Sequence, residues 1–358
     1  MTRLSPMLLL CISCGSSTPE NTDTGAPVQD SGQAVIDAGN ASPDAGSEIN
    51  DAGAQTSDAD TVVDAGTTAD AGTTADASDP MTDAGSAAAD SGVTPPPEQR
   101  SVRPGVQEIV IEQEVAGERA SRPVIIQAPM QLDPNRRYPI VFAFHGNGGR
   151  PQGFLGQLRR FVDAGRFIAI LPTGMERSWN LGREASQADD IAFVGMIMQR
   201  LSAYRNFNFE RVFAYGFSNG SGLVNQLAAH TDHFNAYAMG ASALVQSLLP
   251  PEQIHLASFL SLHGTEDDAC PYDGGRGVLG YDFLPVEDSA ALWASKIGCS
   301  RFPISSRTDD GNRKLDWSPC RDGHRVIHYG FQGAGHGLPN DQEGGLINLI
   351  VEFFEATP

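Results

Sequence analysis

The aromatic residues of this 358-residue chain are confined to its C-terminal part, which limits what each part can fold into. All 27 Phe, Trp and Tyr residues lie at or after Tyr138, whereas Gly15 to Pro97 holds 15 acidic residues and no Lys or Arg. A charged segment without aromatic residues cannot bury enough apolar surface to offset its chain entropy. We therefore expect residues 15–99 to be a disordered acidic linker and residues 100–358 to form one folded domain.

Charge and hydropathy exclude two broad classes of function. The formal net charge of −20 excludes a protein that binds nucleic acid through a basic surface. A membrane-spanning helix needs roughly 18 consecutive apolar residues, and no run in the chain reaches that length. The sequence therefore does not encode a multi-pass membrane protein.

The first 14 residues have the features of an export signal. Arg3 precedes a short apolar run, 7–12, which is too short to span a membrane. The segment 12–15, Ile-Ser-Cys-Gly, resembles a bacterial lipoprotein processing site with Cys14 as the lipidated residue, although Cys11 stands where Leu is usual. An ordinary signal peptide is the alternative. We expect an extracellular or cell-envelope protein, tethered to the outer membrane through lipid on Cys14.

The linker repeats the tripeptide Asp-Ala-Gly six times between residues 37 and 85. It lacks the large apolar positions that a stacked solenoid needs. Calcium binding by the Asp residues is an alternative, but a calcium loop needs several ligands that converge on one fixed turn. We expect a solvated spacer with a root-mean-square reach of about 50 Å.

Residues 100–358 alternate between apolar strand patterns and helical patterns, which is typical of a mostly parallel, doubly wound α/β sheet. The segments 106–115 and 123–127 are expected to form an antiparallel pair. Continuous apolar runs, typical of strands buried on both faces, lie at 138–144, 167–171, 211–215, 257–262 and 325–329. Helices are expected at 154–164, 190–201 and 223–229.

A G-x-S-x-G motif, residues 216–220, directly follows the apolar run 211–215 and precedes a helical pattern. This strand–turn–helix context is typical of a nucleophile elbow, in which the glycines are needed because the turn leaves no room for a β-carbon. Ser218 would then stand at a helix N-terminus, where the helix dipole favours developing negative charge. A plain tight turn is the alternative.

A serine nucleophile needs a base, and the base needs an orienting acid. In α/β-hydrolases these follow in the order Ser, acid, His. His336 lies in a glycine-rich loop after the last apolar run and is the expected base; the acid is expected among Glu266, Asp267 and Asp268. The other histidines are expected to pack in loops or to be exposed: His145, His230, His233, His255, His263, His324 and His328.

Two further segments are expected to complete the site. The loop 145–149, His-Gly-Asn-Gly-Gly, follows the first buried strand, where the hydrolase fold places one backbone donor for an oxyanion. We assign this donor to Asn147, with Gly148 as the alternative, and the second donor to Asn219. Trp179 is expected either to stack on a substrate or to pack under a loop. No metal and no organic cofactor is expected.

Five segments together resemble the secreted polyhydroxybutyrate depolymerase/feruloyl esterase family of α/β-hydrolases, over about residues 105–355. The resemblance implies an α/β-hydrolase fold, with Asp267 as the acid because it lies four residues after the His of a His-Gly-Thr segment. It also implies a disulfide between Cys299 and Cys320, worth about 3 kcal/mol in the chain-entropy model. The segments are 144–149, 189–193, 211–220, 263–275 and 335–339.

The resemblance implies an exported serine esterase that acts on polyhydroxybutyrate-type polyesters or their oligomers. A feruloyl or acetyl-xylan esterase that acts on plant cell-wall esters is the alternative within the family. A peptidase on the same fold and a catalytically silent surface binding protein are the other classes. We expect a monomer whose only partner is an ester substrate.

Three residues depart from the family pattern: Ser221, Cys270 and Leu338. Ser221 and Leu338 are expected to reshape the acyl or alcohol pocket. Cys270 is expected to be a buried apolar thiol, with a further disulfide as the alternative.

Overall fold

The computed structural model describes residues 100–339 and 345–358. The predicted signal segment 1–14 with Cys14, and the predicted linker 15–99, lie outside these described residues.

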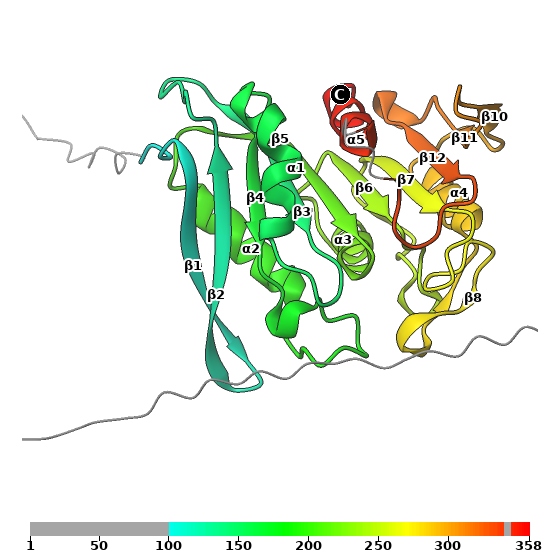
Figure 1. The fold of residues 1–358 in the computed structure, drawn as a ribbon, viewed down its shortest axis with the longest axis horizontal. Coiled ribbons are helices and arrows are strands. Elements are labelled where there is room, and N and C mark those ends of the chain that lie inside the picture. The colour runs from blue at the N-terminus through cyan, green and yellow to red at the C-terminus, as the bar shows by residue number, and fades with distance from the viewer. Residues whose placement is uncertain (1–99, 340–344) are drawn as a thin grey trace, which may run out of the picture. The chain divides into compact units, whose positions relative to one another are not determined.

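A mixed sheet of ten strands forms the centre of the described domain (Figure 1). Its strands are β1 (Gly105–Val115), β2 (Glu118–Ala128), β3 (Tyr138–Phe144), β4 (Ile168–Pro172), β5 (Phe207–Phe217), β6 (Ala236–Gly240), β7 (Ser258–Gly264), β10 (Ile304–Arg307), β11 (Arg313–Asp316) and β12 (Val326–Phe331). Their order is β1-β2-β4-β3-β5-β6-β7-β12-β11-β10. The strands from β4 to β12 run parallel, and antiparallel pairs extend the sheet at both edges. The predicted pairing of 106–115 with 123–127 is confirmed in β1 and β2.

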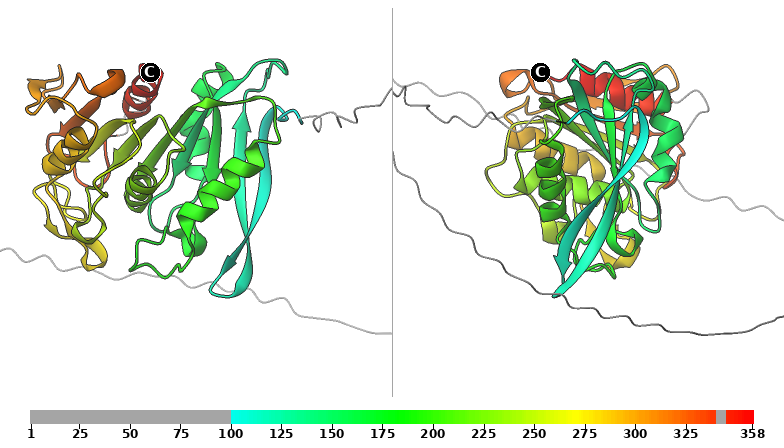
Figure 2. Two further views of the ribbon diagram at one scale, coloured as in Figure 1. Left: turned by 180° about the vertical axis from the view of Figure 1, so that it is seen from behind. Right: turned by 90° about the vertical axis from the view of Figure 1, so that its left-hand side faces the viewer.

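Helices cover both faces of this sheet, as Figure 2 shows. On one face α1 (Gln152–Asp163) and α5 (Gly345–Glu355) pack with one apolar core, and on the other α2 (Asp190–Leu201), α3 (Asn219–His230) and α4 (Val286–Lys296) pack with a second. Successive side chains of a strand point to opposite faces. Phe142 of β3 therefore belongs to one core and Val141 to the other. The central strands are apolar without interruption because both of their faces are covered.

The winding direction of the sheet changes at β3. Strand β4, which follows β3 in sequence, lies on one side of it, and β5 lies on the other side. In doubly wound sheets this arrangement opens a crevice at the carboxyl ends of the strands, and ligands bind there. The loop after β3 and the turn after β5 both lead into this crevice.

The sequence predictions omitted β6, α4, α5 and the two short edge strands. Strand β6 has the sequence Ala-Tyr-Ala-Met-Gly, and Ala and Gly are depleted in strands, so the local pattern does not indicate one. Pairing with β5 on one side and β7 on the other places it in the sheet. The disulfide that the resemblance implied joins Cys299 to Cys320.

Candidate active site

Ser218 stands on a strained turn between β5 and α3. Its backbone has φ +54° and ψ −120°, in the left-handed range of φ that a residue with a β-carbon rarely adopts. A β-carbon on Gly216 would lie 2.3 Å from the Gly220 carbonyl oxygen, and one on Gly220 would lie 2.2 Å from the Phe144 carbonyl oxygen. The turn thus requires glycine at both places, and it presents the partly exposed Ser218 hydroxyl at the N-terminus of α3.

The structure brings Ser218, His336 and Asp267 together from the loops after β5, β12 and β7. His336 Nε2 lies 2.8 Å from Ser218 Oγ, and its Nδ1 lies 2.9 Å from Asp267 Oδ2 and 3.1 Å from Oδ1. This is the geometry of a nucleophile, a base and an orienting acid. The alternative acids Glu266 and Asp268 make no hydrogen bond or ion pair with His336 in the described structure.

The carboxylate of Asp267 is fully buried, yet it is well supplied with donors. Its Oδ1 accepts hydrogen bonds from the backbone amides of Ala269 and Cys270, each at 2.9 Å. Burial by itself raises the pKa of Asp267, but hydrogen bonds from His263, His336 and the Cys270 amide outweigh burial and hold this pKa well below its usual range. Asp267 is therefore ionised at neutral pH and can stabilise a positive charge on His336.

The loop after β3 leaves one backbone donor free beside the nucleophile. The Gly148 N–H donates to the Arg177 carbonyl at 2.8 Å, so the alternative oxyanion donor is already in use. Within the described part of the chain, the N–H groups of Asn147 and Asn219 donate to no acceptor, and both residues line the same cavity as Ser218. These two amides are the ones that the sequence analysis assigned to an oxyanion.

Trp179 is buried beneath the loop after β3 and does not reach the cavity. It is fully buried, with its ring edge-on to Phe144 and its Nε1 donating to the His145 carbonyl at 2.7 Å. Its backbone N–H and carbonyl hold both ends of the Asn219 side-chain amide, at 2.7 and 2.9 Å. The prediction that Trp179 stacks on a substrate is therefore wrong, because no face of the indole is exposed. The residue instead joins the two segments that supply the oxyanion donors.

His145 also has a structural role. Its Nδ1 donates to the Gly146 carbonyl at 2.9 Å and its Nε2 accepts from the Gly174 N–H at 3.1 Å. Burial lowers the pKa of this imidazole. The ring thereby holds the loop after β3 in one conformation.

A cavity of about 380 Å³ opens in front of Ser218 and His336. One wall comes from the segment between β8 (Gly275–Arg276) and β9 (Asp282–Phe283), which the sequence predictions did not include. The volume lies within the range of small-molecule sites and exceeds what an acetyl group occupies. Most of the lining is apolar or aromatic: Leu181, Val245, Ala269, Cys270, Val278, Leu279, Tyr281 and Phe283. Two polar side chains, Glu184 and Ser242, also line the cavity.

Glu184 is a site residue that sequence reasoning missed, because an isolated Glu in a loop gives no signal. Its Oε1 accepts from the Asn219 side-chain amide at 3.1 Å, and its Oε2 accepts from the Tyr281 hydroxyl at 3.0 Å. The Leu181 N–H donates to the same Oε2 at 2.7 Å. Glu184 thus connects the residue after the nucleophile to the aromatic wall of the cavity.

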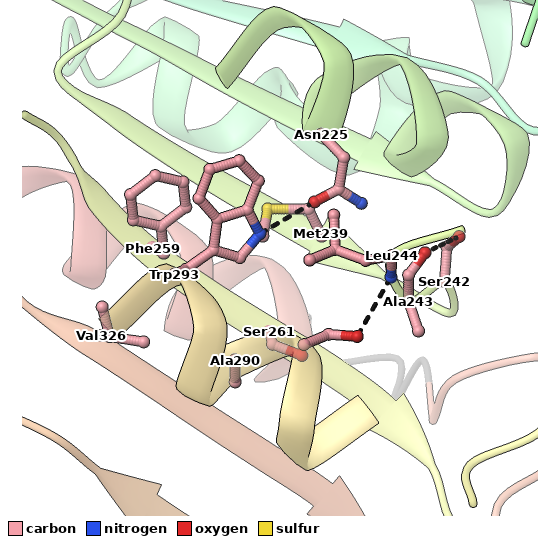
Figure 3. Close-up of a pocket in the computed structure, with 11 residues that line it drawn as sticks. Asn225, Met239, Ser242, Ala243, Leu244, Phe259, Ser261, Ala290, Trp293 and Val326 are labelled. Atoms are coloured by element: carbon pink, nitrogen blue, oxygen red, sulfur yellow. Dashed lines mark hydrogen bonds between the residues drawn. The ribbon is translucent and has the colours of Figure 1, made fainter. Parts of the chain in front are cut away.

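A second cavity, drawn in Figure 3, lies in the interior between α3, β7 and α4. Its volume is about 10 Å³, enough for about one water molecule. The Phe259 and Trp293 rings stack beside it with centroids 4.5 Å apart, and Trp293 Nε1 donates to Asn225 Oδ1 at 3.1 Å. This void is a packing feature and has no room for an ester.

The family departures have different structural consequences. Ser221 is fully buried beneath the elbow, where its hydroxyl contacts the Gly216 carbonyl and the Gly240 N–H, so it does not line the cavity and the expected pocket change is wrong for it. Cys270 is a buried free cysteine whose thiol lines the cavity, and burial raises its pKa to about 12. Among the described cysteines it has no disulfide partner, because Cys299 and Cys320 pair with each other.

No group of three or more His, Cys, Asp or Glu side chains among the described residues is arranged to hold a metal ion. No described helix combines the length and apolar character that crossing a membrane requires.

Comparison with known proteins identifies ester hydrolases, although no family model matches the sequence. Feruloyl esterase C of Emericella nidulans is 25% identical over 248 residues, which cover 66% of this chain and 84% of that protein. Feruloyl esterase B of Piromyces equi is 24% identical over 229 residues, which cover 60% of this chain but only 42% of that protein.

A solved structure shows the same fold. An acetyl xylan esterase from Aspergillus awamori superimposes with a TM-score of 0.50 at 15% identity, covering 71% of this chain and 100% of that one. The polyhydroxybutyrate depolymerase part of the expected resemblance is not shown by these relatives. The chain has the α/β-hydrolase fold, and its sequence relatives are ester hydrolases of the feruloyl and acetylxylan esterase type.

Proposed function

We propose that this chain is a serine esterase that hydrolyses carboxylic esters through an acyl-enzyme. The observation that carries the proposal is the unbroken hydrogen-bonded series from Ser218 through His336 to Asp267, at the edge of a cavity that also holds two free backbone amides. A catalytically silent binding protein has no need for this alignment. The esterase relatives support the same conclusion.

In the proposed mechanism Ser218 Oγ attacks the ester carbonyl while His336 Nε2 takes its proton. The amides of Asn147 and Asn219 bind the oxyanion of the tetrahedral intermediate. His336 then gives the proton to the departing alcohol, which leaves an acyl group on Ser218. A water molecule, deprotonated by the same imidazole, attacks this acyl group; His336 then returns the proton to Ser218 Oγ as the bond to the acyl group breaks and the acid leaves. Asp267 holds the imidazole with Nδ1–H toward its carboxylate throughout.

The cavity favours an acyl group larger than acetyl. Tyr281 and Phe283 supply an aromatic wall, and Glu184 and Ser242 supply polar groups within it. Such a lining suits the phenolic acyl group of a feruloyl ester, and the named relatives support plant cell-wall esters as the substrate class. The polyhydroxybutyrate-type polyester, the first substrate class predicted from the sequence, remains a prediction, and the panel of esters described below includes it.

We also propose that the enzyme is exported and acts outside the cytoplasm as a monomer. The support is the signal-like segment 1–14, with tethering to the outer membrane through Cys14. Expression of the full chain with Cys14→Ala, followed by cell fractionation, examines the tether. The variant should move from the membrane fraction to the soluble fraction, and an unchanged distribution would rule out lipid on Cys14.

The decisive experiment compares the full chain with its Ser218→Ala variant on a panel of esters. The panel contains p-nitrophenyl acetate, p-nitrophenyl butyrate, methyl ferulate and amorphous polyhydroxybutyrate. Turnover by the wild type should fall at least about 10³-fold in the variant, because the nucleophile is gone. The best substrate separates a feruloyl esterase from an acetyl esterase and from a depolymerase. A wild type that is inert on every ester would refute the proposal and favour a binding or peptidase role.

A further inference from the structure

A second histidine, besides His336, contacts the Asp267 carboxylate. His263, in β7, is fully buried, and its Nε2 lies 2.8 Å from the Cys270 carbonyl oxygen and 3.1 Å from Asp267 Oδ2. Both facing atoms are acceptors, so Nε2 carries the ring hydrogen. The Nδ1 atom has no hydrogen-bond partner in the described part of the chain. In the described structure the polar contacts of this side chain are therefore made only with Asp267 and with the Cys270 carbonyl of the same loop.

The two oxygens of Asp267 are held differently. Oδ1 accepts two backbone amides, which are fixed by the fold of the loop. Oδ2 makes the shorter contact to the Nδ1 of His336, and in the described structure His263 is the other side chain that contacts it. The single Nε2–H of His263 is shared between Oδ2 at 3.1 Å and the Cys270 carbonyl oxygen at 2.8 Å. Loss of that donor would leave the oxygen that orients the base with no support except from the base itself.

The surrounding residues keep the His263 ring in place. It packs edge-on against Tyr272, with ring centroids 5.9 Å apart. The Tyr272 hydroxyl in turn donates to Glu287 Oε1 at 3.0 Å. A ring fixed by its neighbours can donate a hydrogen bond without first losing conformational entropy, which is the requirement for a supporting residue.

We propose that His263 is a positioning residue for catalysis: its Nε2–H fixes Asp267 Oδ2 and, through it, the orientation of His336. This inference rests on the proposed serine esterase function, since it assigns the residue a part in that same site. His263 touches neither the cavity nor the nucleophile, so it acts only through Asp267.

Three variants of the full chain separate positioning from space filling. His263→Phe keeps a ring and removes the donor. In His263→Gln the side-chain amide nitrogen reaches about the position of Nε2 and can replace its donor. In His263→Asn the amide nitrogen reaches only about the position of Nδ1, an atom that has no hydrogen-bond partner in the described structure. His328→Phe is the matched control, because it removes another fully buried histidine of the same cluster that does not contact Asp267.

Steady-state kinetics on p-nitrophenyl butyrate at pH 7.5, with kcat normalised to the burst of p-nitrophenol, report turnover per competent site. We expect His263→Phe to lower kcat about 10- to 100-fold with KM changed less than two-fold, as misplacement of a catalytic group does. His263→Gln should recover most of this loss, and His263→Asn should not. His328→Phe should keep kcat within about three-fold, because no donor to Asp267 is lost.

The outcomes are distinct. Full kcat in His263→Phe, equal rescue by Gln and Asn, or an equal loss in His328→Phe would each overturn the positioning role while leaving the serine esterase intact. If His263→Phe does not fold, the comparison of Gln with Asn decides. A wild type without esterase activity would instead refute the proposed function itself.

Discussion

Replacement of His328 by Phe should make stability less sensitive to acid. His328 lies in β12, fully buried, with its Nδ1 3.0 Å from Ser261 Oγ and its Nε2 2.8 Å from the Tyr272 hydroxyl. Burial, followed by the proximity of His263 and Arg313, lowers the pKa of His328 to about 3 from its usual 6.5. The folded protein therefore keeps this imidazole neutral over a range in which the unfolded chain protonates it.

The sign and size of the effect follow from proton linkage. Between pH 6.5 and 3 the unfolded state binds more protons at this residue, so the free energy of unfolding decreases as the pH falls. One pH unit corresponds to about 1.4 kcal/mol, so lowering the pH from 7 to 4.5 should remove roughly 2–3 kcal/mol through His328 alone. His328→Phe lacks this term, but it leaves the Ser261 hydroxyl without its partner and removes one of the two hydrogen bonds of the Tyr272 hydroxyl, a loss of about 1–2 kcal/mol at every pH.

The two stability curves should therefore cross. At pH 7 the wild type should be more stable than His328→Phe by about 1–2 kcal/mol, and near pH 4.5 the variant should be the more stable of the two by about 1 kcal/mol. Urea unfolding of both proteins, followed by tryptophan fluorescence at several pH values, gives the difference in unfolding free energy. All other titrating groups are shared and largely cancel in this difference. A difference that does not change between pH 7 and 4.5 would show that His328 is protonated, or accessible to protons, in the folded state.

Two other predictions concern the elbow and the oxyanion site. Gly220→Ala should lower the unfolding free energy by about 1–3 kcal/mol and reduce kcat, because its β-carbon would lie 2.2 Å from a β3 carbonyl oxygen. A β-carbon on Gly153 in α1 would have no atom within 4 Å, so Gly153→Ala should raise the unfolding free energy by up to about 1 kcal/mol. Thermal unfolding measures the stability of both variants, and steady-state kinetics measures kcat. Glu184→Ala should lower kcat/KM about ten-fold, because it removes one of the three hydrogen bonds that hold the Asn219 side chain beside the nucleophile. Tyr281→Phe removes one hydrogen bond from the same carboxylate and should stay within about three-fold; equal losses in the two variants would contradict a role through Asn219.

Much of the fold can be predicted because it depends on patterns within short segments. Strand β3 is apolar at successive positions since both of its faces are covered, and the G-x-S-x-G turn carries its conformational requirement in its two glycines. The predictions of Ser218, of His336 and of an acid in the loop after the 257–262 strand follow the same logic, since parallel strands bring their carboxyl ends to one edge; the choice of Asp267 within that loop came from the family resemblance. Their proximity in the structure agrees with that expectation.

The remaining features depend on contacts between segments that are distant in sequence, and no local pattern encodes them. Strand β6 is a strand because β5 and β7 pair with both of its edges, despite its alanines and glycine. Trp179 is of a residue type that often contacts substrates, but in the structure it is buried and donates to the His145 carbonyl in the loop after β3. Glu184 meets Asn219 and Tyr281 across separations of 35 and 97 residues. Local periodicity and backbone requirements thus determine most of the central strands, the helices between them and the position of the nucleophile. The order of strands in the sheet alone decides which loops meet, and through them the walls of the cavity and the residues that hold the catalytic groups in place.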